Sequence, residues 1–164
     1  MQRAASILTS LLRHSALAGA LFLLIGASPA WPAPEEVLSA EEKESLQQAK
    51  DPEQQLKLWL RIADSRLKDI VLYTRELDKA NSAKAVTGFR AAVASADDRV
   101  AKEQGGKNHK KLLLQLHKAV KKYNFTLLQV LDKAAEEFRQ YIQSAFEASQ
   151  RVQDAAEIQM AHFQ

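Results

Sequence analysis

Residues 52–80 read PEQQLKLWLRIADSRLKDIVLYTRELDKA, and their apolar side chains follow the period of an α-helix. The stripe consists of Leu56, Leu60, Ala63, Leu67, Ile70 and Leu77. Other apolar residues, among them Trp59 and Tyr73, widen this stripe past half of the circumference. A helix that is apolar over so much of its surface needs two neighbours or more.

The remainder of the chain is equally permissive for helix. From Glu53 to Gln164 it contains no proline and only three glycines, Gly88, Gly105 and Gly106. Proline lacks the backbone N–H and clashes with the preceding turn, so its absence favours long helices. No segment alternates with period two over a useful length. We therefore predict an all-α protein, an antiparallel up-and-down helical bundle that could include coiled-coil packing.

Capping residues predict where the first two helices begin. Ser39 and Glu42 have the spacing of a capping box, which predicts a short helix over 39–50. Asp51 precedes Pro52 as an N-cap precedes a first helical residue, which predicts a second helix over 52–80.

The later boundaries are less strongly marked. A second apolar stripe, from Val86 to Val100, is out of phase with the first. This mismatch predicts a break at residues 81–82 and a third helix over 83–104, although the sequence leaves the continuity of the two helices open. Residues 105–106 are both glycine and predict a turn. A final stripe predicts one uninterrupted helix over 108–160.

The N-terminus has the pattern of a signal peptide. Residues 1–14 hold Arg3 and Arg13 and no acid, residues 15–25 are apolar, and Ser28 and Ala30 suit a cleavage site. We expect a signal peptide over 1–30, an extended lead-in over 31–38, and a single helical-bundle domain over 39–164. The protein would then be soluble and periplasmic or secreted. An uncleaved anchor is the alternative, but a membrane span needs about 20 apolar residues.

Positive charge is concentrated in residues 107–122, KNHKKLLLQLHKAVKK, which hold six lysines and no acid. Without the two arginines of residues 1–30, the rest of the chain has 21 basic and 20 acidic residues. On a helical wheel the lysines lie opposite the apolar face, and Leu114 lies among them. We predict that this basic segment binds an anionic partner through Lys107, Lys110, Lys111, Lys118, Lys121 and Lys122.

Several partners suit such a face: an anionic lipid surface, an acidic polymer or an acidic protein. Nucleic acid is disfavoured, because neither arginine nor an aromatic residue is interleaved with the lysines. The alternative is internal neutralisation, with acidic residues 41–53 folded over the lysines.

Catalytic, cofactor and metal sites are not predicted. The chain has no cysteine, which excludes thiol catalysis and disulfides. His109 and His117 share a flank of one predicted helix among lysines, so we expect them to be exposed to solvent rather than to bind a metal. We expect a non-enzymatic interaction module, with a periplasmic holdase-type chaperone or a small-ligand sensor as alternatives and a homodimer left open.

Overall fold

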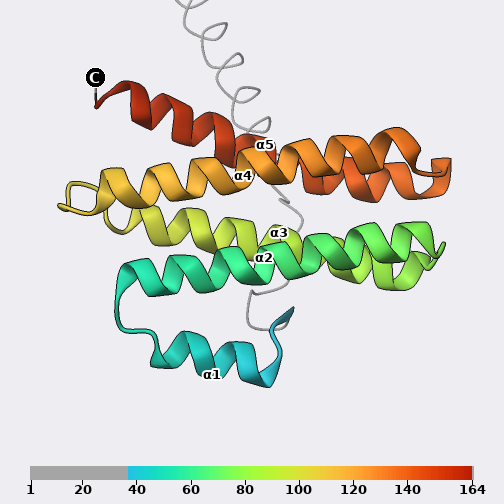
Figure 1. Cartoon of the computed structure of the whole chain (residues 1–164), viewed down its shortest axis with the longest axis horizontal. Helices are drawn as coiled ribbons and strands as arrows, with labels where there is room; N and C mark the ends of the chain where they lie inside the picture. The colour runs from blue at the N-terminus through green and yellow to red at the C-terminus, as the bar shows by residue number, and fades with distance from the viewer. Residues whose placement is uncertain (1–36, 164) are drawn as a thin grey trace, which may run out of the picture. The chain divides into compact units, whose positions relative to one another are not determined.

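The computed structural model describes residues 37–163, which form helices and turns and no β-strand (Figure 1). The helices of this part of the chain are α1 (Ala40–Gln48), α2 (Pro52–Arg75), α3 (Lys79–Ala101), α4 (His109–Lys133) and α5 (Glu136–Ala161). The predicted all-α bundle is therefore confirmed. The expected signal peptide over 1–30, and the lead-in up to residue 36, lie outside the described residues.

Both predicted N-terminal caps are confirmed. The Ser39 hydroxyl accepts from the backbone N–H of Glu42 at 3.1 Å, and the Glu42 carboxylate accepts from the N–H of Ser39 at 2.7 Å. The Asp51 carboxylate accepts from the N–H of Gln54 at 3.0 Å. These bonds satisfy amides that have no partner within the helix, so they determine where α1 and α2 begin.

The predicted break between the second and third helices was wrong by several residues. Helix α2 ends at Arg75, and Leu77 takes a left-handed conformation with φ of 59°. The N–H of Asp78 then donates to the carbonyl of Tyr73 at 2.9 Å, which is the hydrogen bond of a Schellman motif. Asp78 also caps α3, because its carboxylate accepts from the backbone and side-chain amides of Asn81. Asn81 is thus the partner of a cap and lies within α3.

Ser82, the other residue of the predicted break, is buried. Its hydroxyl lies 3.4 Å from that of Thr74, where α2 and α3 face each other across the turn. The two glycines after α3 do form a turn as predicted, and Gly105 has φ of 81°. Helix α4 then begins at His109, within one residue of the predicted start.

The single helix predicted over 108–160 was also wrong. It is two helices, α4 and α5, joined at Ala134 and Ala135, which both have extended backbone angles. Neither residue is a turn former, so the local sequence gives no signal for the corner. An unbroken helix of this length would extend about 80 Å at 1.5 Å per residue, far beyond the ends of α2 and α3. Folding back instead buries Phe138 and Ile142 against the rest of the bundle.

The long helices form two antiparallel hairpins, α2 with α3 and α4 with α5 (Figure 1). The hairpins pack with α4 beside α2 and α5 beside α3. Helices α2 and α4 run parallel, because Glu53 meets Lys111 near their starts and Asp64 meets Lys122 farther along. This parallel pairing places the basic segment next to an acidic edge of α2.

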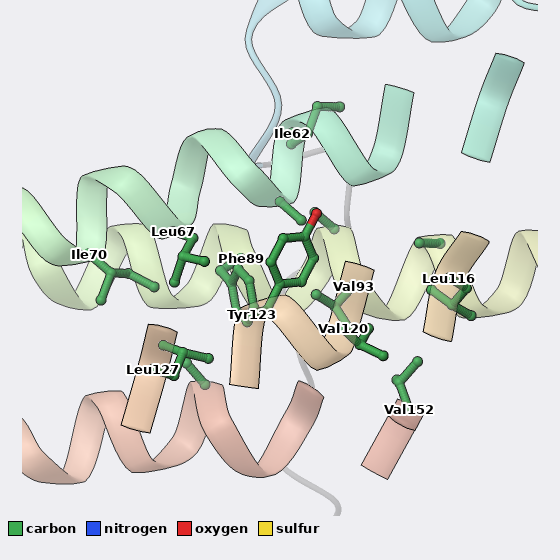
Figure 2. Packing of buried hydrophobic residues seen from close by; sticks show 14 of the residues in the cluster. Ile62, Leu67, Ile70, Phe89, Val93, Leu116, Val120, Tyr123, Leu127 and Val152 are labelled. Atoms are coloured by element: carbon green, nitrogen blue, oxygen red, sulfur yellow. The ribbon is translucent and has the colours of Figure 1, made fainter. Parts of the chain in front are cut away.

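One apolar core connects the four long helices (Figure 2). The ring of Tyr123 packs edge-on against Phe89, with ring centres 5.6 Å apart. Its hydroxyl donates to the carbonyl of Leu60 at 2.8 Å. Burial, aided by the negative charge of Asp64, raises the pKa of Tyr123, so this donor stays protonated. The predicted stripe of the second helix supplies Leu56, Ala63, Leu67 and Ile70 to this core.

Arg66 of α2 binds a residue of α1. One guanidinium nitrogen of Arg66 donates to both carboxylate oxygens of Glu42, at 3.0 and 2.8 Å. Gly88 makes room for this side chain, since a Cβ there would lie 3.1 Å from Cδ of Arg66. Glu42 thus takes part in both the capping box and the ion pair with Arg66.

Candidate functional site: the basic face of α4

Helix α4 has four sides, each with different surroundings. One side lies in the core, a second faces α2, and a third faces α5 through His117 and Asn124. The fourth side points away from the other helices. We call it the outward face, and it consists of Leu114, Lys118, Lys121, Phe125 and Leu128, all of which are exposed.

Two of the six predicted lysines pair with acids on α2 and do not belong to the outward face. Nζ of Lys111 lies 2.5 Å from the Glu53 carboxylate, and Nζ of Lys122 lies 2.8 Å from Asp64. Each acid also pairs with a lysine of its own helix, Glu53 with Lys57 at 2.9 Å and Asp64 with Lys68 at 3.1 Å. Every one of these lysines is more than half exposed, so each acid bridges two cations at the surface.

The lysines lower the pKa values of these two carboxylates. Hydrogen bonds from Lys111, and then from Lys57, lower the pKa of Glu53 to about 2. The hydrogen bond from Lys122 is likewise the main cause that lowers the pKa of Asp64. Both acids therefore stay ionised at neutral pH and offset part of the positive charge of α4.

The expected neutralisation by residues 41–53 is realised only at its last residue. Glu53 reaches the basic segment, whereas Glu42 pairs with Arg66. Helix α1 packs on α2, and the second acid that meets a lysine of α4, Asp64, comes from the middle of α2. Sequence reasoning missed this pairing because it depends on α2 and α4 lying side by side.

The other four lysines interact less with acidic residues. Nζ of Lys110 lies over the ring of Phe163, 5.9 Å from its centre. Lys121 is near enough to Glu157 to contribute to lowering the pKa of that acid, after Gln153 and His117. Within residues 37–163, Lys107 and Lys118 form no ion pair. The structure thus separates the six predicted lysines into a pair bound to α2 and four directed to solvent.

Apolar side chains accompany the exposed lysines. Leu114 is 49% exposed, as its position among the lysines predicts, and Phe125 and Leu128 are 65% and 48% exposed. The exposure of Phe125 and Leu128 was not predicted from the sequence. Their signal is the alternating spacing of four and three residues that leads from Leu114 through Lys118 and Lys121 to Phe125 and Leu128.

The histidines do not form a common site. His109 is only 4% exposed, and its ring centre lies 5.5 Å from that of Phe163, after the end of α5. The expectation that His109 faces solvent was therefore wrong. Nε2 of His117 lies 3.0 Å from the carboxylate of Glu157 on α5. Over the described range, no three potential metal ligands are grouped together.

None of the helices in residues 37–163 has both the length and the apolar character of a membrane span. Comparison of the chain with models of known families, with curated proteins and with solved structures finds no match.

Proposed function

We propose that the protein is a non-enzymatic interaction module that binds an anionic partner through the outward face of α4. One observation carries the proposal: Lys118 and Lys121 are exposed on a helix whose only acid, Asp132, lies near its C-terminal end. Lysines in the first turn of a helix oppose the helix dipole, and Lys110 does so in α4 without the ion pair to α2 that Lys111 has. A feature that disfavours the isolated helix is often explained by function.

Fold stability does not account for these side chains. Lys118 is exposed and forms no ion pair within the described part of the chain. By contrast, Lys111 and Lys122 connect α4 to α2, so they have a structural role and are secondary candidates for binding. We therefore assign the primary role in partner binding to Lys118 and Lys121, with Lys107 and Lys110 extending the positive surface toward the start of α4.

The proposal includes export. Residues 1–30 carry the basic, apolar and small-residue regions of a signal peptide, and the partner would then belong to the cell envelope or its surroundings. Sequencing the N-terminus of protein recovered outside the cytoplasm tests this part. A start at Trp31 supports it, and recovery only of uncleaved protein in the cytoplasm contradicts it.

A polyanion assay tests the binding site itself. We expect dextran sulfate to bind the wild-type chain, with affinity that falls as salt rises, because charges at the surface are screened beyond about 8 Å at physiological ionic strength. The variant K118Q/K121Q should lose most of this binding. The control K79Q/K84Q removes the same charge from exposed positions on α3 and should bind as wild type does. Equal binding by wild type and both variants would overturn the assignment.

A further inference from the structure

The outward face combines charge with apolar surface along one line. Leu114, Lys118, Lys121, Phe125 and Leu128 are spaced by four, three, four and three residues, so they follow one side of α4. From Leu114 to Leu128 this line extends about 21 Å at 1.5 Å per residue. A cationic centre is therefore flanked at both ends by large exposed apolar side chains.

The lysines and the apolar side chains of this line favour different chemical groups on a partner. The lysines favour anionic groups, which any acidic polymer supplies. The apolar side chains contribute favourable free energy only when they leave water for apolar surroundings, as would apply to Leu114, Phe125 and Leu128. A hydrated polyanion does not offer such surroundings. The boundary of an anionic bilayer supplies both together: charged headgroups lie above acyl chains, and lysine stems can lie along apolar surface while their charges stay in water.

The acids around this line lie at its edges. Asp132 follows Leu128 by one turn of α4. Glu157 of α5 bonds to His117 and Gln153 and lies on the α5 side of Lys121. Glu53 and Asp64 lie toward α2, where they are paired with Lys111 and Lys122. The line from Leu114 to Leu128 itself contains no carboxylate that an anionic surface would repel.

We infer that the outward face of α4 docks onto an anionic lipid bilayer, with Phe125 and Leu128 entering the headgroup boundary and Lys118 and Lys121 contacting lipid phosphates. This inference rests on the proposed function and identifies its partner. The protein lies on the membrane surface through this face, and the bundle keeps its fold because the inserted side chains take no part in the core.

The absence of cysteine from the chain permits a site-specific test. Phe125→Cys, labelled with an environment-sensitive fluorophore, reports whether this position leaves water. Ala94→Cys on α3, also exposed, is the matched control. Both full-length proteins are titrated with vesicles of phosphatidylglycerol and phosphatidylcholine, and with vesicles of phosphatidylcholine alone. Because the label reports its own surroundings, attachment through another part of the chain does not produce the signal.

We expect a blue shift and a brighter emission at position 125, but not at position 94, with the anionic vesicles only. Adding K118Q/K121Q to the labelled Phe125→Cys protein should raise the lipid concentration at half-maximal change about 30-fold, since each lysine near an anionic surface contributes about 1 kcal/mol. No change at position 125 overturns the inference. If dextran sulfate still binds in a manner that depends on Lys118 and Lys121, the proposed function stands and an acidic protein or polymer is the partner; if it does not, both fail.

Discussion

Leu77 occupies a backbone conformation that usually belongs to glycine. Its φ of 59° places it at the C′ position after α2, and its side chain is 63% exposed. A residue with a side chain in the left-handed region costs roughly 1–2 kcal/mol. Glycine avoids this steric cost, but it loses more conformational freedom on folding, so only part of the cost is recovered. We expect Leu77→Gly to raise the free energy of unfolding by about 0.5–1 kcal/mol in urea denaturation.

The matched control is Leu72→Gly, because Leu72 is also exposed but lies inside α2. Glycine in a helix interior should lower stability by about 1 kcal/mol. A loss of stability in both variants would show that the turn after α2 does not strain Leu77.

Glu53 should give the fold a measurable dependence on acid. Its pKa falls from an ordinary value of 4.5 to about 2, with Lys111 as the first cause. Between these two values the unfolded chain binds more protons than the folded one, so the contribution is complete above about pH 4.5 and is lost as the pH falls toward 2. The melting temperatures of wild type and Glu53→Gln should therefore converge as the pH is lowered through this window. A gap that stays constant would contradict the pairing with Lys111.

At the scale of elements, the corner between α4 and α5 lacks the usual chemical signals. Ala135 holds the N-cap position of α5 with φ of −61° and ψ of 150°, and it has no side chain that could accept from the first-turn amides. We expect Ala135→Ser to stabilise the protein by about 1 kcal/mol, because a serine hydroxyl can cap those amides. Thermal denaturation followed by circular dichroism measures the gain.

Ala94→Ser provides the comparison, since Ala94 is exposed within α3 and its backbone amide is already bonded. Serine there should cost about 0.5 kcal/mol through lower helix propensity. If Ala135→Ser were as destabilising as Ala94→Ser, the chain would continue as helix through residue 135 and the described corner would be wrong.

At the scale of the whole molecule, one phenylalanine belongs to the folded core and another to the proposed docking surface. Phe138 of α5 is fully buried in the common core, whereas Phe125 of α4 is 65% exposed. Phe138→Ala should lower the free energy of unfolding by about 3–5 kcal/mol, because it leaves a cavity where the hairpins meet. Phe125→Ala should change it by no more than about 0.5 kcal/mol. Equal losses in chemical denaturation would show that Phe125 belongs to the core and could not serve docking.

The sequence determined those features that depend on neighbouring residues. Capping by Ser39 and Asp51, the glycine turn at Gly105 and the apolar stripe of α2 all follow from contacts within a few positions. The exposure of Leu114 was also predictable, since the helical period alone places it opposite the core. The predicted class, an all-α bundle, rested on these local signals and was confirmed.

Tertiary structure decided the features that depend on which helices meet. The corner at Ala135 exists because α5 buries Phe138 against the bundle, and no local signal marks it. Lys111 and Lys122 are paired and Lys118 is not, because the parallel packing of α2 against α4 brings Glu53 and Asp64 beside the first two. Helical period assigns a residue to a side of its helix, but the burial of apolar surface between helices decides which sides become interior, paired or free.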